Sequence, residues 1–152
     1  MSMTSGSNKL FHTRKAFQSD LDSIKQLADQ HRKELGFVMR PSLQKSIEQE
    51  EIFVTILENE MVGFVHYHHR RDQQTTLYHI AVSPRHRCLG IGKDLINHLR
   101  DEAIKQQKLL ITLKCPIVLP ANEFYKRYGL SLVRVETGKA QPLNVWTLML
   151  SQ

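Results

Sequence analysis

Residues 76–114 constrain the fold more than any other stretch of the chain. Residues 76–82 (TLYHIAV) form a β-branched and aromatic run that predicts a strand. A basic loop with two glycines follows, and apolar residues then recur at helical spacing from Leu95 to Ile104. Residues 109–114 predict the next strand. A strand, a crossover helix and a second strand place two parallel neighbours in one sheet, through a connection that is almost always right-handed.

Two helices are predicted upstream of this unit. The first is capped at residue 19 or 20, carries apolar residues at three- and four-residue spacing, and ends at Gly36. Residues 37–40 are predicted to be a loop, because the residue before Pro41 avoids the α region. A second, shorter helix is expected over residues 42–49.

The remaining elements are mostly strands. Strands are predicted at residues 10–16, 51–58, 61–70, 132–135 and 143–150. Asn59 and Glu60 separate two of these runs, which is the signature of a tight antiparallel hairpin. The last helix is predicted to open at Pro120 and to be closed by Gly129.

The predicted order of elements is β-α-α-β-β-β-α-β-α-β-β. This order indicates a mixed α/β protein with one seven-stranded mixed sheet and helices on both of its faces. The chain has 152 residues, which suits one domain. We therefore expect a polar, flexible start over residues 1–9 and a single domain over residues 10–152.

The composition of the chain excludes several classes of protein. The sequence has no run of about 20 apolar residues and no apolar segment of a secretory signal at its start, so we expect a cytoplasmic protein without membrane contact. The two cysteines, Cys88 and Cys115, have no metal-ligand spacing. The net charge of +6 favours anionic partners, without choosing between nucleic acid and a phosphorylated cofactor.

The loop after the strand at residues 76–82 carries a recognisable pattern. Gly90 and Gly92 lie where a strand leads into a helix, where the backbone can approach a ligand and the helix offers free N–H groups. A diphosphate would fit there. The loop lacks the lysine and hydroxyl residue of a P-loop and the full GxGxxG of a dinucleotide fold. Paired glycines before a helix are also common in ordinary turns. The sequence of the loop by itself therefore does not decide between a diphosphate site and a turn.

Two motifs together resemble one family. Arg87-x-x-Gly90-x-Gly92, after the strand that ends at Val82, resembles the acyl-CoA signature of the GNAT N-acetyltransferases, Arg/Gln-x-x-Gly-x-Gly/Ala. Residues 121–130 (ANEFYKRYGL) look like the family's AN-x-FYEKLGF helix. The order of elements agrees as well, and the resemblance covers residues 11–150. It implies the GNAT acyl-CoA N-acyltransferase fold.

The resemblance implies acetyl-CoA as cosubstrate and no metal. Backbone N–H groups of residues 87–93 would hold the CoA pyrophosphate, and pantetheine would lie like an extra strand against residues 80–82. Cys88 stands where many family members have glycine, which predicts a weaker affinity for CoA than glycine would give. The implied cofactor-binding residues are Ile80, Ala81, Val82, Arg85, Arg87, Cys88, Leu89, Gly90, Ile91, Gly92, Lys93, Asn122 and Tyr125.

Two residues are candidates for proton transfer. Tyr125 matches the family tyrosine near the CoA sulfur and would be the general acid for the departing thiolate. Without the motif, ordinary aromatic packing in a helix that also carries Phe124 and Tyr128 would be the better explanation. His79 is the nearest titratable candidate for the base, and His66 and His68, two residues apart on one strand, are alternatives.

Histidines also have simpler interpretations. These three imidazoles could be packed or solvated without any role in catalysis. They could in principle converge on a metal, but no acidic ligand accompanies them.

The function implied is N-acetyl transfer to a primary amine by direct attack in a ternary complex. The sequence does not name the acceptor, which could be a small molecule, a protein N-terminus or a lysine, and it leaves a homodimer open. A basic nucleic-acid-binding module and a CoA-binding protein without catalysis are the alternatives. The first lacks the interleaved aromatic residues of such modules, so no nucleic-acid partner is expected, and the presence of Tyr125 speaks against the second.

Overall fold

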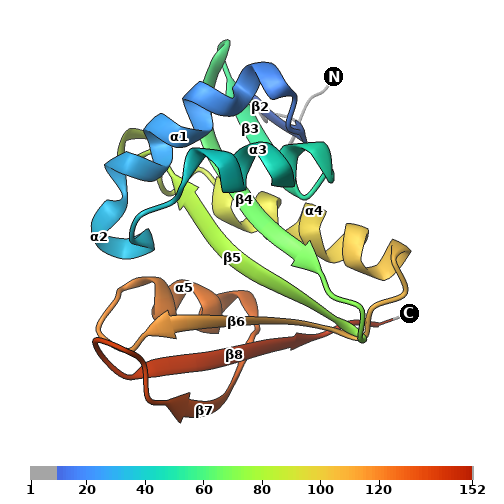
Figure 1. The fold of residues 1–152 in the computed structure, drawn as a ribbon, viewed down its shortest axis with the longest axis vertical. Coiled ribbons are helices and arrows are strands. Elements are labelled where there is room, and N and C mark those ends of the chain that lie inside the picture. The colour runs from blue at the N-terminus through green and yellow to red at the C-terminus, as the bar shows by residue number, and fades with distance from the viewer. Residues whose placement is uncertain (1–9, 152) are drawn as a thin grey trace. The chain divides into compact units, whose positions relative to one another are not determined.

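The computed structural model describes residues 10–151, so the expectation for residues 1–9 lies outside the described residues. Figure 1 shows the arrangement of the elements along the chain. The helices are α1 (Leu21–Gln30), α2 (Arg32–Leu35), α3 (Arg40–Glu48), α4 (Ile91–Lys105) and α5 (Ala121–Tyr128). The strands are β2 (Phe11–Lys15), β3 (Ile52–Leu57), β4 (Glu60–His69), β5 (Gln74–Val82), β6 (Leu110–Pro116), β7 (Ser131–Glu136) and β8 (Leu143–Met149).

The strands form the seven-stranded mixed sheet that the sequence predicts. Their hydrogen-bonded order is β2-β3-β4-β5-β6-β8-β7. β5 and β6 are parallel, and they are joined through α4, which confirms the predicted crossover. The chain divides into two compact units. The first unit comprises the residues up to 66 together with 79–98, and the second comprises residues 67–78 together with those from 99 onward.

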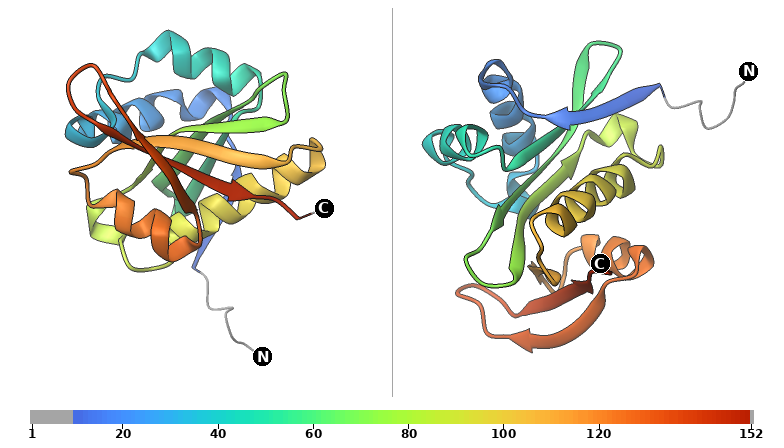
Figure 2. Two further views of the ribbon diagram at one scale, coloured as in Figure 1. Left: turned by 90° about the horizontal axis from the view of Figure 1, so that it is seen from below. Right: turned by 90° about the vertical axis from the view of Figure 1, so that its right-hand side faces the viewer.

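Helices cover both faces of the strands in the first unit. Phe64 is fully buried in a cluster with Leu27 of α1 and Leu43 of α3. Its neighbour Gly63 lies on the other face, where an added Cβ would be 3.1 Å from Ile91 of α4. Successive residues of a strand point to opposite faces, so α1 and α3 cover one face and α4 the other. The right-hand view of Figure 2 shows these helices on either side of the strands.

The first helix is shorter than predicted. The pattern of apolar residues predicts one helix to Gly36, whereas the structure ends α1 at Gln30 and starts α2 at Arg32. The backbone N–H of His31 donates to the carbonyl of Ala28, three residues earlier. The carbonyl of Leu27, which a helical N–H of residue 31 would normally bond, accepts a hydrogen bond from the ring of His31. A side chain that bonds the carbonyl four residues before it competes with the helical ladder, which explains the break.

The β3–β4 hairpin is confirmed, with its turn displaced by one residue. Asn59 and Glu60 are the predicted turn residues, but positive φ angles occur at Glu58 (51°) and Asn59 (65°). Two consecutive left-handed residues are what a tight turn between right-twisted strands requires. β4 therefore begins at Glu60, one residue earlier than expected.

The second unit is built on β6. β6 pairs with the start of β5 on one side, from Gln74↔Leu110 to Thr76↔Thr112, and with β8 along its whole length on the other. β7 completes this end of the sheet as an edge strand. Gly129 closes α5 with a φ of 118°, as the sequence predicts for a C-terminal cap. None of the helices in residues 10–151 is both long and apolar enough to cross a lipid bilayer.

Candidate functional site

The loop between β5 and α4 is exposed and basic. A short 3₁₀ turn at Pro84–His86 follows β5, and α4 begins at Ile91 and runs for 15 residues. The side chains of Arg85, Arg87 and Lys93 are all exposed. A helix of this length presents free N–H groups and a positive dipole end at its first turn, and the cations add to that potential. The loop is therefore suited to bind an anion.

The backbone of this loop adopts left-handed conformations at two positions. Cys88 has a φ of 67° and Gly90 a φ of 86°. Glycine enters this region freely, whereas a residue with a Cβ pays roughly 1–2 kcal/mol. A Cβ built on Gly90 would have no heavy atom within 4 Å, so open space lies beside this backbone. Glycine at this position therefore keeps the space beside the loop open.

His31 connects this loop to α1, a contact that the sequence does not predict. The side chain is 5% exposed, and its Nδ1 donates to the carbonyl of Leu27 at 2.9 Å. Its Nε2 lies 3.1 Å from the carbonyl oxygen of Val82 and 3.3 Å from Nη2 of Arg87. Arg87, the first residue of the Arg-x-x-Gly-x-Gly motif, therefore rests against the end of α1. His31 sits on the apolar face of α1, and a polar residue there is the only signal that the sequence offered.

Two of the three candidate histidines meet in the first unit. Nδ1 of His66 on β4 lies 3.2 Å from Nδ1 of His79 on β5, with the two rings stacked. On its other side, Nε2 of His66 is 2.7 Å from the hydroxyl of Ser46 on α3. His66 is 3% exposed and Ser46 9%, while His79 remains partly exposed. Burial lowers the pKa of His79 below its ordinary value, so this imidazole is neutral at pH 7.

The third candidate histidine has a different environment. His68 stacks on Tyr78, with 6.5 Å between ring centroids and 10° between planes. Within residues 10–151, no three His, Cys, Asp or Glu side chains lie close enough together to hold a metal ion.

The sequence around Ser46 carries a signal of a buried hydrogen bond. Ser46 lies on the buried face of α3, between Leu43 and Ile47. A hydroxyl at a buried helical position requires a partner, because burying a polar group without a hydrogen bond is costly. His66 is twenty residues away along the chain, and only the fold identifies it as that partner.

Helix α5 of the second unit is held by Asn122. Its Nδ2 donates to the carbonyl oxygens of Leu119 at 2.8 Å and Pro116 at 2.9 Å. Its Oδ1 accepts hydrogen bonds from Nδ2 of Asn144 at 3.0 Å and Nε1 of Trp146 at 2.9 Å. The amide thereby ties α5 to the end of β6 and to β8. This network fixes the helix that carries Tyr125.

Tyr125 is buried within the second unit. Its side chain is 6% exposed and packs near Phe124 and Trp146, with ring centroids 5.6 Å and 6.4 Å away. Burial raises the pKa of its phenol well above the ordinary value of 10, and the nearby Cys115 thiol raises it further. Burial also raises the pKa of Cys115 to about 11. Both groups therefore keep their protons throughout the physiological range.

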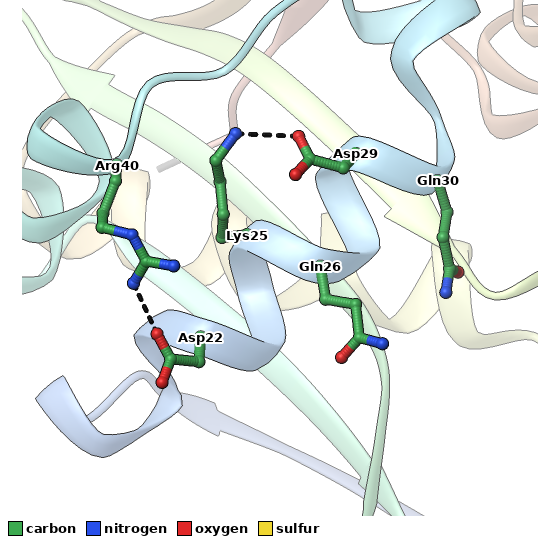
Figure 3. A pocket seen from close by; sticks show the side chains of 6 residues that line it. All are labelled: Asp22, Lys25, Gln26, Asp29, Gln30 and Arg40. Carbon is green, nitrogen blue, oxygen red and sulfur yellow. Dashed lines mark hydrogen bonds and ion pairs between the residues drawn. The ribbon is translucent and has the colours of Figure 1, made fainter.

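An open hollow lies along the outer side of α1, lined by Asp22, Lys25, Gln26, Asp29, Gln30 and Arg40 (Figure 3). Its charges are already paired, because Arg40 bonds Asp22 and Lys25 bonds Asp29. Paired surface charges do not select a ligand of either sign. Next to it, Phe37 is 63% exposed between the cations of Lys25 and Arg32.

Comparisons with known proteins agree with the motifs. The family model described as Acetyltransferase (GNAT) family matches residues 15–130. No curated protein sequence matches the chain. Among solved structures, Ard1 from Thermoplasma volcanium is similar, with a TM-score of 0.83, 17% identity, and coverage of 94% of this chain and 99% of that one.

Two further structures are similar over most of their length. The ribosomal-protein-S18-alanine N-acetyltransferase from Escherichia coli has a TM-score of 0.77 and 18% identity, and the match covers 93% of this chain and 95% of that one. The putative acetyltransferase yncA from Salmonella typhimurium, solved with its cofactor acetyl-CoA, has a TM-score of 0.77, 17% identity and the same coverage. At these identities, the structural likeness establishes the fold.

Proposed function

The chain belongs to the GNAT acetyltransferase family, and from this premise we propose that it transfers the acetyl group of acetyl-CoA to a primary amine. The observation that carries the proposal is the loop at residues 83–90 followed by α4. It combines exposed cations, a left-handed glycine beside open space, and the N-terminus of a long helix.

The loop is suited to a diphosphate in particular. A diphosphate needs several convergent N–H donors and little side-chain specificity. In this proposal, the backbone of residues 87–93 binds the pyrophosphate, and the side chains of Arg85, Arg87 and Lys93 add positive charge. Leu89, Ile91 and Gly92 take part through their N–H groups. The Cβ of Cys88 narrows the space next to the phosphates, so affinity is lower than a glycine would give.

The pantetheine arm is proposed to lie along Ile80, Ala81 and Val82. These residues end β5, directly before the basic loop, and an extended ligand can pair with the backbone of a strand. The amides of pantetheine would occupy these positions, and an N–H near Val82 would polarise the thioester carbonyl.

Tyr125 is proposed to be the general acid. Its motif position supports this role, and its raised pKa means that the phenol carries its proton at any pH where the enzyme works. A phenol is a weaker acid than a thiol, so proton transfer to the departing thiolate depends on close positioning. The hydrogen bonds of Asn122, which fix α5, supply part of that positioning. In this proposal, Asn122 contributes to cofactor binding indirectly, because it holds α5, the helix that carries Tyr125.

His79 is proposed to be the general base. It is the titratable residue on β5 nearest to residues 80–82, it is partly exposed, and its lowered pKa keeps it neutral at pH 7. In the proposed reaction, His79 takes a proton from the ammonium of the acceptor. The amine nitrogen then bonds to the acetyl carbon as the carbon–sulfur bond breaks, and the sulfur takes the proton of Tyr125. The nitrogen of the new amide loses its remaining extra proton to solvent, and Tyr125 regains a proton from solvent.

The test is the release of CoA from acetyl-CoA in the presence of different amines. Small primary amines, peptides with free N-termini, and peptides with an internal lysine and a blocked N-terminus should be compared, with free thiol measured over time. The proposal expects at least one class to release CoA above the rate without amine, together with acetylated product in mass spectra. Binding of acetyl-CoA without turnover on any class would contradict catalysis and favour the CoA-binding alternative.

A further inference from the structure

The ring of His31 faces three polar groups of the first unit that it cannot bond all at once. Its Nδ1 lies 2.9 Å from the carbonyl oxygen of Leu27. Its Nε2 lies 3.1 Å from the carbonyl oxygen of Val82 and 3.3 Å from Nη2 of Arg87. A carbonyl oxygen only accepts hydrogen bonds, and a guanidinium only donates them. Nε2 therefore bonds Val82 if it carries a hydrogen, and Arg87 if it carries a lone pair.

The two contacts of Nε2 correspond to two charge states of the ring. Nδ1 carries a hydrogen in both states, because the carbonyl of Leu27 can only accept. With a lone pair on Nε2, the ring is neutral and accepts a hydrogen bond from Arg87. With a hydrogen on Nε2 as well, the ring is a cation that donates to both carbonyls, and its charge repels the guanidinium of Arg87.

The surroundings of His31 favour the neutral ring while Arg87 is close. The side chain is 5% exposed, so water screens the repulsion between two cations poorly. Within residues 10–151, carboxylates contact the rings of His69 and His98, and none bonds the ring of His31. The other charged or titratable side chains of α2 and of the loop after β5 are exposed, apart from the half-buried His86; they are Arg32, Lys33, Glu34, Arg85 and His86.

An anion bound to the loop reverses this preference. When the guanidinium of Arg87 donates to phosphate oxygens, Nε2 of His31 loses its donor and its lone pair faces the carbonyl of Val82. A proton on Nε2 turns that contact into a hydrogen bond with a charged donor, which is about twice as strong as a neutral one. The negative charge of the anion also offsets the positive charge of the ring.

We propose that His31 is a positioning residue that holds Arg87 in the free protein and takes up a proton when a diphosphate draws Arg87 away. The step is the transfer of one proton from solvent to the lone pair of Nε2, and the hydrogen on Nδ1 stays in place. This inference rests on the proposed function in one respect, namely that the loop binds the diphosphate of CoA. The two exclusive contacts of Nε2 are a property of the protein alone.

Binding of the diphosphate and uptake of the proton must strengthen each other, because coupling between two binding events is reciprocal. The bound protein holds more protons than the free protein, so the affinity for acetyl-CoA should rise as the pH falls through the range in which imidazoles titrate, about pH 8 to 5. The gain due to His31 should be about fivefold to tenfold, at the lower end of common coupling factors.

The experiment compares the wild type with His31→Gln, which keeps a polar side chain that stays uncharged, and with the control His12→Gln. His12 is an exposed histidine on β2. Calorimetric titration with acetyl-CoA at pH 7, in buffers of different ionisation enthalpy, measures the protons taken up on binding. The phosphates of the ligand titrate alike with every protein, so their contribution cancels in the differences. Thermal melts confirm that each variant is folded.

The wild type and His12→Gln should take up more protons than His31→Gln, by a difference of at most one proton. The affinity of His31→Gln should also depend less on pH. Arg87→Leu should bind acetyl-CoA more weakly and take up fewer protons than the wild type, because no donor is exchanged at Nε2. Equal uptake by the wild type and His31→Gln would overturn the inference, and undiminished uptake by Arg87→Leu would overturn the role of Arg87 in it.

A second measurement needs only the wild type, so it remains decisive if His31→Gln does not fold. In protein labelled with ¹⁵N-histidine, nitrogen chemical shifts report whether Nε2 of His31 carries a hydrogen. The expected result at pH 7.5 is a lone pair on Nε2 without ligand and a hydrogen on Nε2 at saturating acetyl-CoA. A hydrogen on Nε2 already in the free protein would overturn the inference, as would a lone pair that remains in the complex.

Failure of the proposed function gives a different result. If acetyl-CoA does not bind, the assignment of the cofactor is wrong, and inorganic pyrophosphate at millimolar concentration becomes the probe. Protonation of Nε2 by bound pyrophosphate would still support the exchange at His31. No binding of pyrophosphate, or binding without a change at Nε2, would overturn it.

Discussion

The loop at residues 83–90, together with the first turn of α4, and helix α5 contribute to the proposed reaction in opposite ways. The loop is exposed, and its useful groups are backbone N–H donors and a left-handed Gly90. Helix α5 is fixed by side-chain hydrogen bonds of Asn122 and presents a single buried phenol, Tyr125. In the proposed reaction, binding of CoA would depend on backbone conformation in the loop, and chemistry would depend on an individual side chain of α5.

This difference predicts which properties respond to mutation. Changes of side chain in the loop should alter affinity for CoA and leave the chemical step nearly unchanged. Changes at Tyr125 should do the reverse. Each of the following experiments can separate the two regions or show that they are not separable.

The largest effect is expected for Tyr125→Phe, which keeps the ring and its packing but removes the proton. General acid catalysis is worth about 10²–10⁴-fold, so kcat should fall by that factor while the affinity for CoA changes little. Single-turnover measurements are required, because slow product release would hide the loss. An unchanged single-turnover rate would show that Tyr125 is not the acid, and lost affinity alone would assign it to packing against the cofactor.

Gly90→Glu should abolish tight binding of CoA. It introduces a Cβ at a φ of 86° and a negative charge that would face the pyrophosphate. Like charges brought together cost several kcal/mol, so affinity should drop by much more than about tenfold. Isothermal titration with CoA measures it.

Gly36→Glu is the matched control for that variant. Gly36 also has a positive φ, 74°, and open space around it, but it lies at the end of α2. It should lose at least as much stability, because its ψ of −160° places it in a region that essentially only glycine adopts, and it should keep its affinity for CoA. Equal losses of affinity in both variants would mean that strain or net charge, and not the loop, controls binding.

The buried thiol in the second unit predicts a pH dependence of stability. The pKa of Cys115 is raised from 9.0 to about 11, so the folded state holds a proton that the unfolded chain releases above pH 9. The free energy of unfolding should therefore be fully retained below pH 9 and fall between pH 9 and 11, by up to about 3 kcal/mol from this group.

Denaturant melts of Cys115→Ala across this range provide the test. The variant should be less stable overall, but its stability should decline less steeply around pH 9, which is below the ordinary pKa of 10 at which Tyr125 ionises in the unfolded chain. Cys88→Ala, at the exposed cysteine, should retain the wild-type slope. The same slope in all three proteins would contradict the assignment to the buried thiol.

The smallest effect is expected at Cys88. Its φ of 67° is unfavourable for any residue with a Cβ, so Cys88→Gly should relieve about 1 kcal/mol of backbone strain in the folded state. The greater conformational entropy of glycine in the unfolded chain offsets part of this gain, so the net stabilisation should be small. The variant should also bind CoA more tightly, because the Cβ beside the phosphates is gone. Cys88→Ala keeps the Cβ and should show neither gain. In the wild type, bound CoA should protect Cys88 from alkylation.

The parts of this account that come from local sequence were predictable. The Arg87 to Gly92 motif and the closure of α5 at Gly129 depend on residues next to one another, and the structure has the loop and the cap where they were expected. The break at His31 was missed, because a polar residue on the apolar face of α1 does not by itself reveal that its ring bonds the carbonyl of Leu27. The contact between Ser46 and His66 joins residues from different elements, and only tertiary structure brings them together.

The central claim is that the loop and α4 bind acetyl-CoA, and thermal unfolding with and without this ligand tests it most directly. A ligand that binds only the folded state adds about 2.7 kcal/mol at 100 times its Kd, which for a chain of 152 residues corresponds to a rise in Tm of roughly 5–10 °C. Such a rise is expected in the wild type and in Tyr125→Phe, and none is expected in Gly90→Glu. No shift of the wild-type Tm at millimolar acetyl-CoA would contradict it.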